Sequence, residues 1–204
     1  MPMKLIGSHT SPFARKIAIL LQEKGVAFDF VNDPPGKPES RVTDYNPLGK
    51  IPVLLPNEGG CWFDSPLLAE YVELTYPEPA FLPANPLHSL QVRQLEAAAD
   101  GVTDAAILIV MELQRPVAEQ SVAFMDKQRL KISRGLNFLE QAAANQQFCN
   151  LPQLNLADIA IVCLLDYLLF REVDVHWPKR CPHLHALLLR LGDRASVMTT
   201  RPHS

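Results

Sequence analysis

The chain has 204 residues, and 48% of them are hydrophobic, which is enough to bury a core and argues against a disordered chain. The formal net charge is −3 and the pI is near 6.1, so the composition gives no reason to expect nucleic acid or an anionic membrane as a partner. A chain of this length forms either one large domain or two small ones.

The cysteines and the N-terminus favour a protein of a reducing compartment. We expect free, buried thiols and no metal, because the four cysteines form no C-x-x-C pair and no Cys/His cluster of metal-ligand spacing: Cys61, Cys149, Cys163 and Cys181. The first residues enter a strand-like run without the basic and long apolar segments of a signal peptide. The most apolar segment, 159–169, is shorter than the ~20 residues that span a bilayer. We therefore expect a cytoplasmic protein with no membrane partner.

The first part of the chain has the pattern of a β-α-β unit. Residues 4–7 are a candidate strand, and Pro12 begins a helix whose apolar side chains recur on one face: Phe13, Ile17, Leu20 and Leu21. Gly25 is typical of a helix C-cap, and the alternating run 26–31 predicts a second strand. Residues 32–46 predict a loop, with a short helix around residues 40–45.

The stretch from Leu48 to Tyr71 carries the main functional pattern. Pro52 begins a short apolar strand, where its missing N–H costs no ladder hydrogen bond, and it keeps Ile51 extended. Ile51 can then pair main chain to main chain with an extended ligand. A turn at residues 57–60 and a second strand at 61–63 return the chain towards its starting point.

Asp64 and Ser65, which follow this hairpin, are therefore expected near Ile51. Ser65 followed by Pro66 predicts a helix start with Ser65 as N-cap, and the expected inward face is Leu67, Leu68, Tyr71 and Val72. The free N–H groups of a helix start attract a carboxylate, and Asp64 supplies a negative charge for an ammonium group. The pattern indicates a small peptide-like ligand. The simpler alternative is an ordinary strand start at Pro52 and an ordinary cap at Ser65.

At this point the sequence resembles the glutathione transferases. The run from Asn46 to Leu54 is similar to that family's proline turn over its whole length, and Asp64-Ser65 resembles its acid-serine helix start. The resemblance implies a thioredoxin-like domain, glutathione as co-substrate and a cis bond before Pro52. It also implies that Lys50 pairs with the glycine carboxylate of glutathione, although a solvated lysine in a turn is the alternative.

Ser11 is the expected catalytic residue, because it precedes Pro12 at the helix start where a thioredoxin-like fold places its reactive group. No Ser-His-acid constellation is recognisable, so we expect the hydroxyl to donate a hydrogen bond to the glutathione sulfur and favour the thiolate. The family uses Tyr, Ser or Cys at this position, and this chain resembles its bacterial, serine-type branch. The alternatives are that Ser11 is only an N-cap, or that Thr10 or Ser8 contacts the thiol. His9 is interpreted as an exposed loop histidine.

The second part of the chain predicts helices. The four prolines within 77–86 predict an interdomain linker. Beyond it, apolar periodicity predicts helices over 87–113, 125–143 and 182–191. A further helix begins at Asn155, where Asp158 completes a variant capping box that also resembles the family.

These patterns predict a thioredoxin-like α/β N-terminal domain at residues 1–76, followed after the linker by an all-α helical bundle at residues 87–204. The expected function is a glutathione transferase that activates the thiol of reduced glutathione for attack on a small hydrophobic electrophile held against the helical half. The resemblance implies a homodimer, in which Asp100 or Asp104 could reach the ligand across the interface, or could belong to a solvated face. Two other functions stay open: a non-catalytic binding or regulatory module, and a glutathione-dependent disulfide reductase.

Overall fold

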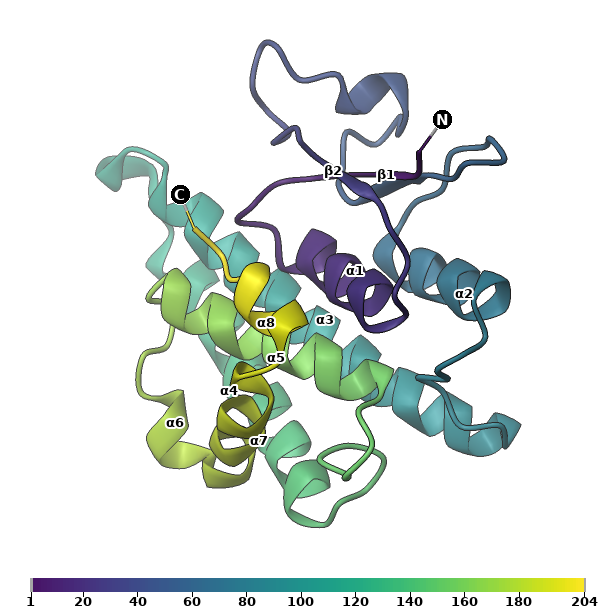
Figure 1. Ribbon diagram of the computed structural model, residues 1–204. Helices are drawn as coiled ribbons and strands as arrows, with labels where there is room; N and C mark the ends of the chain where they lie inside the picture. Colours follow the sequence, from purple (N-terminus) through teal and green to yellow (C-terminus); the bar gives the residue numbers. More distant parts are fainter. Residues whose placement is uncertain (1, 204) are drawn as a thin grey trace. The chain divides into compact units, whose positions relative to one another are not determined.

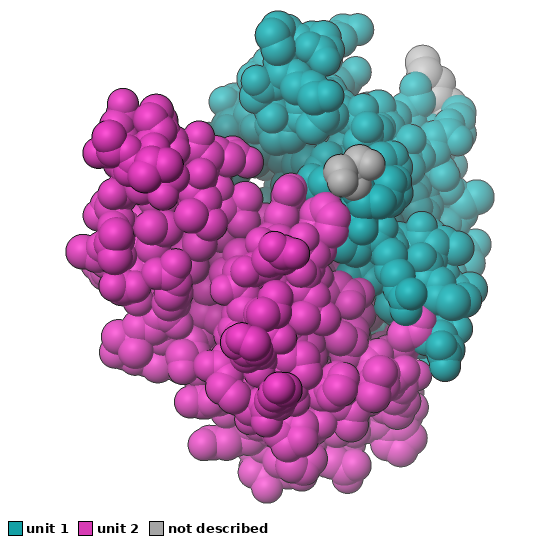
Figure 2. All heavy atoms as spheres, turned by 90° about the vertical axis from the view of Figure 1, so that its left-hand side faces the viewer, with its two compact units in different colours: residues 1–82, 193–204 teal, residues 83–192 magenta. Residues whose placement is uncertain are grey.

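The computed structural model describes residues 2–203, which divide into two compact units. One unit is residues 83–192, and the other combines the chain up to residue 82 with the chain from residue 193 onwards (Figures 1 and 2). The observed division therefore differs from the predicted domain boundaries at the C-terminal end of the chain. Together the two units give the expected fold class, a thioredoxin-like α/β unit and a helical unit.

The first unit contains a three-stranded mixed sheet in the order β2-β1-β3. The central strand β1 (Lys4–Gly7) pairs in parallel with β2 (Asp29–Asn32) and antiparallel with β3 (Val53–Leu55). The strand predicted over 26–31 begins later than expected, because the Val26 N–H donates to the Leu21 carbonyl, 2.9 Å away, and closes the preceding helix.

The strand predicted over 61–63 is reduced to one bridge. Leu54 and Trp62 exchange backbone hydrogen bonds of 2.9 and 3.0 Å. A turn closed by the Gly59 N–H and the Pro56 carbonyl comes before the bridge, and a helix begins at Ser65 soon after it. Little extended chain is left between the turn and the helix for a longer ladder.

Two helices pack on this sheet and against each other, α1 (Pro12–Glu23) and α2 (Ser65–Thr75) (Figure 1). The predicted start of α1 is confirmed, since Ser11 is its N-cap, and Gly25 follows its C-cap with a φ of 66°. The N-cap of α2 is Asp64, so the prediction of Ser65 was wrong by one residue.

The predicted inward face of α2 was also partly wrong. Leu68 and Val72 are fully buried, whereas Leu67 is 45% exposed and Tyr71 stacks on Trp62 with ring centroids 5.5 Å apart. Adjacent helical residues point about 100° apart, so Leu67 and Tyr71 share one face while Leu68 and Val72 share another.

The C-terminal segment belongs to the first unit because α8 (Ala195–Thr199) packs on α1. Arg194 donates to the two Glu23 carboxylate oxygens from Nε, at 2.8 Å, and from Nη2, at 2.6 Å. The Thr199 hydroxyl donates to Gln22 Oε1 at 3.1 Å, and Arg15 Nη2 donates to the Val197 carbonyl at 3.1 Å. The sequence reading missed α8, because only five residues form it and its partners lie far away in the chain.

The Glu23–Arg194 pair makes stability depend on pH. The hydrogen bond from Arg194 is the largest influence, and it lowers the pKa of Glu23 below its ordinary value of 4.5. The stabilisation is therefore complete above pH 4.5 and is lost as the pH falls through the lowered pKa. We expect Glu23→Gln to lower the melting temperature at pH 7 and to have a smaller effect near pH 3. Thermal unfolding of both proteins across this range tests the prediction, and a difference that does not vary with pH would contradict it.

The second unit is a helical bundle. α3 packs against α4 and α5, and α7 packs against α4, α5 and α6. Its helices are α3 (Pro86–Leu113), α4 (Val122–Ala144), α5 (Leu156–Phe170), α6 (Trp177–Arg180) and α7 (Pro182–Gly192). Short one-turn elements at η1 (Val42–Asp44), in the first unit, and η2 (Val117–Glu119) complete the described helical segments.

The capping box at the start of α5 is confirmed. The Asp158 N–H donates to Asn155 Oδ1 at 3.1 Å, and the Asn155 N–H donates to Asp158 Oδ2 at 3.3 Å. Asp158 also accepts the N–H of Asn150 at 2.7 Å. Burial raises the pKa of Asp158 to about 6, so this carboxylate depends on those donors to remain charged at neutral pH.

The four cysteines form no disulfide; three are buried, but Cys61 is exposed, so the expectation of buried thiols was wrong there. Among residues 2–203, no helix combines the length and the apolar character that crossing a membrane requires.

Candidate functional site

The predicted site residues of the first unit gather at one end of its sheet. In the β1–β3 register Ile6 pairs with Val53, so Gly7 at the end of β1 and Pro52 before β3 lie at the same sheet end. The loop that leads from Gly7 to Ser11 therefore leaves the sheet where Pro52 begins the neighbouring strand. The register of β1 and β3 is enough to place this loop next to Pro52.

The Leu54–Trp62 bridge brings the third segment to the same place. The chain is antiparallel there, so Pro52 and Asp64 each lie two residues from the bridge on the same side. Ile51 and Phe63 also pack against one buried cluster that contains Ile6 and Val53. The structure thus places the proline turn and the start of α2 next to each other.

The Ile51–Pro52 peptide bond is cis, as the family resemblance implied. Asn46 builds the turn before it: its Nδ2 donates to the Lys50 carbonyl at 2.8 Å, and its Oδ1 accepts the Leu48 N–H at 3.0 Å. Gly49 allows the turn because its φ is 61°. The sequence reading assigned Asn46 no role, although an asparagine at the start of a turn often bonds the backbone in this way.

The start of α2 offers an anion-binding position. Asp64 is exposed, and its side chain makes no capping hydrogen bond to the helix. Ser65 is only 4% exposed, so almost none of its surface faces bulk water. The Phe63–Asp64 peptide is also cis. Lys50, in contrast, has an exposed side chain.

Ser11 stands at the N-terminus of α1 with its side chain half-buried. Its Oγ accepts the Ala14 N–H at 3.2 Å, and its own N–H donates to the Ser8 carbonyl at 3.0 Å. Since Oγ accepts within the helix, its hydroxyl hydrogen remains available to donate elsewhere. The competing hydroxyls of Ser8 and Thr10 lie 3.3 Å from each other.

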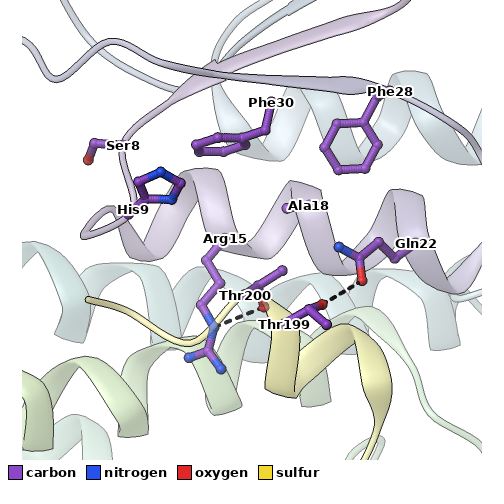
Figure 3. Close-up of a pocket in the computed structure, with 9 residues that line it drawn as sticks. All are labelled: Ser8, His9, Arg15, Ala18, Gln22, Phe28, Phe30, Thr199 and Thr200. Atoms are coloured by element: carbon purple, nitrogen blue, oxygen red, sulfur yellow. Dashed lines mark hydrogen bonds between the residues drawn. The ribbon is translucent and has the colours of Figure 1, made fainter. Parts of the chain in front are cut away.

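A pocket of about 150 Å³ lies beside the same loop (Figure 3). Ser8 and His9 line it together with Phe28, Phe30 and the α1 residue Arg15. His9 is exposed, as expected, but it is not isolated, because its ring stacks on Phe30 with centroids 5.1 Å apart. Among residues 2–203, no three His, Cys, Asp or Glu side chains come together as a group that could hold a metal ion.

Comparison with known proteins agrees with this fold. The sequence pattern of the glutathione S-transferase N-terminal domain matches residues 5–80, and that of the C-terminal domain matches residues 112–190. The chain is 48% identical over 200 residues to the uncharacterized GST-like protein YibF of Escherichia coli K12, covering 98% of each protein.

Among the similar solved structures, two cover nearly the whole chain or all of it. A glutathione S-transferase from Methylobacillus flagellatus KT, with GSH bound, is 39% identical, covers 98% of this chain and 100% of its own, and superposes with a TM-score of 0.92. One from Methylobacterium radiotolerans JCM 2831, in complex with glutathione sulfonate, is 33% identical, covers 100% and 96%, and also has a TM-score of 0.92.

Proposed function

Because this chain belongs to the glutathione transferase family, we propose that it binds reduced glutathione at the sheet end described above and activates its thiol through Ser11. The observation that supports this proposal best is the convergence of three separate segments: the Ser8–Ser11 loop, the Ile51–Pro52 turn and the Asp64–Ser65 helix start. Each offers a different kind of contact.

The contacts match the parts of a γ-glutamyl tripeptide. The backbone of Ile51, next to the cis bond to Pro52, pairs with the cysteinyl backbone of the ligand. Asp64 binds its ammonium group, while Ser65 and the N-terminus of α2 bind the adjacent carboxylate. Lys50 pairs with the glycine carboxylate as an exposed, and therefore weak, contact.

Ser11 then acts on the sulfur. Its hydroxyl donates a hydrogen bond to the thiolate, and the N-terminus of α1 adds a favourable partial charge. A free thiol has a pKa of about 8.5, and lowering it by two units stabilises the thiolate by about 2.7 kcal/mol. That change makes the thiolate the main species at neutral pH.

The thiolate attacks a small hydrophobic electrophile, and we propose that the protein works in the cytoplasm as a homodimer. Asp100 and Asp104 lie on α3. In this proposal, one of them contacts the ligand bound to the partner subunit. Serine rather than cysteine at position 11 favours thiolate activation over exchange through a protein disulfide. The non-catalytic module and the glutathione-dependent disulfide reductase are the competing functions.

The first experiment measures whether glutathione binds to the protein. A ligand that binds only the folded protein stabilises it by about 2.7 kcal/mol at a concentration of 100 times Kd, so glutathione should raise the melting temperature by several degrees. Calorimetry that shows no association at millimolar glutathione would refute the proposal.

The competing functions give different results in the same series. A transferase shows thiolate ultraviolet absorbance from the bound ligand and conjugates a model aromatic halide. Stabilisation without a thiolate signal indicates the binding module. Activity on small mixed disulfides, without conjugation, indicates the reductase.

A further inference from the structure

The C-terminal tail reaches the loop that presents Ser11. The ring of His203 stacks on His9 with centroids 4.4 Å apart and an interplanar angle of 26°. His9 stacks in turn on Phe30 of β2, with centroids 5.1 Å apart and an angle of 28°. Rings from a loop, a strand and the tail thus form one continuous stack.

His9, the middle ring of this stack, belongs to a hydrogen-bonded turn. The Ser11 N–H donates to the Ser8 carbonyl at 3.0 Å, so His9 and Thr10 are enclosed between the two hydrogen-bonded residues. The His9 N–H donates to Asn32 Oδ1 at 3.4 Å, a long bond that holds the turn weakly by itself. The ring stack adds contacts between this turn and two other segments, β2 and the C-terminal tail.

The tail can hold the loop because Thr200, where the tail begins, is itself anchored by hydrogen bonds. Thr200 Oγ1 accepts from Arg15 Nε at 3.3 Å (Figure 3). It also donates to the Ser196 carbonyl at 2.7 Å. A ring nitrogen of His203 lies 3.0 Å from the Arg201 carbonyl, which sets the orientation of the ring. These contacts join the tail to α1, the same helix that Ser11 caps.

We propose that His203 is a positioning residue, which orders the Ser8–Ser11 loop by stacking on His9 and thereby holds the Ser11 hydroxyl in place. His203 does not itself bind the ligand in this mechanism. The catalytic consequence rests on the proposed function, because it assumes that Ser11 acts on glutathione. The ordering of the loop can be measured without any ligand.

The test compares His203→Ala with His203→Phe, which keeps a stacking ring. An aromatic pair shifts a local equilibrium by about three- to tenfold, so the Ser11 amide hydrogen of ligand-free His203→Ala should exchange faster by that factor. His203→Phe should exchange like the unchanged protein. His88→Ala is a matched control, because it removes an exposed histidine that packs on Phe148 in the other unit.

The catalytic readout follows in the same variants. His203→Ala should lower the thiolate-to-thiol ratio of bound glutathione by about three- to tenfold, and His203→Phe should restore it. Equal Ser11 exchange in His203→Ala and the unchanged protein would overturn the proposal, and so would a Phe variant that behaves like the Ala variant. An unchanged protein without any thiolate signal would refute the proposed function instead, and amide exchange alone would then decide the role of His203.

Discussion

Replacing Ser11 with alanine is expected to lower kcat/KM for glutathione conjugation by about 10- to 100-fold. A hydrogen bond to a charged group contributes about 1.5–3 kcal/mol, and the Ser11 hydroxyl is free to donate one because its oxygen already accepts the Ala14 N–H. The thiolate absorbance of bound glutathione should fall with the rate. The Kd for glutathione should change little, since the other contacts proposed for the tripeptide lie on the Ile51–Pro52 turn and the α2 start.

Control variants distinguish the proposed catalytic role of Ser11 from its role as N-cap of α1. Ser11→Ala also removes the N-cap of α1, which costs about 1 kcal/mol of stability, whereas glycine at an N-cap costs only a few tenths. Ser11→Gly should therefore be nearly as stable as the unchanged protein and as inactive as Ser11→Ala. Thr10→Ala and Ser8→Ala should retain the thiolate. If one of them loses it while Ser11→Ala keeps it, the catalytic hydroxyl has been misassigned.

Replacing Lys24 with methionine is expected to cause the largest loss of stability, about 3–5 kcal/mol, because it leaves a buried charge without its partner. The Lys24 side chain has no exposed surface, and its ammonium lies 2.8 Å from Glu73 Oε1. The same ammonium donates to the carbonyls of Tyr76, at 2.6 Å, and Pro79, at 2.8 Å. One side chain thus joins the end of α1 to α2 and to the segment that follows it.

A double-mutant cycle isolates this ion pair. Lys24→Met alone should lower the melting temperature by about 10 °C, as measured by thermal unfolding. Adding Glu73→Gln removes the uncompensated carboxylate, so the double variant should recover part of the loss. A loss below about 1 kcal/mol in the single variant would show that the buried pair contributes no more than an exposed one.

Part of the candidate site can be predicted from the sequence alone. Ser11, Pro52 and Asp64 stand at the ends of local elements whose signals lie in adjacent residues, such as proline after a capping residue. The assignment of Ser65 as N-cap failed by one residue, because Asp64 and Ser65 are both acceptable caps and local pattern does not choose between them. Asn46 was missed because its role appears only when its hydrogen bonds to Leu48 and Lys50 are seen.

The sequence by itself determined the elements whose stabilising contacts are close in the chain. These include β1, the start of α1 at Ser11 and the capping box of Asn155 and Asp158. Their signals are spacing and capping, which act within a few residues.

Only the tertiary structure decided the features that depend on distant partners. It placed α8 on α1 through Arg194 and Glu23, joined Lys24 to Glu73, and stacked His203 on His9. Each contact joins residues that are far apart in sequence, and local pattern carries no information about which distant segments meet. The physical reason is that burial and pairing energies depend on the completed packing, whereas propensity and capping depend on the neighbouring residues.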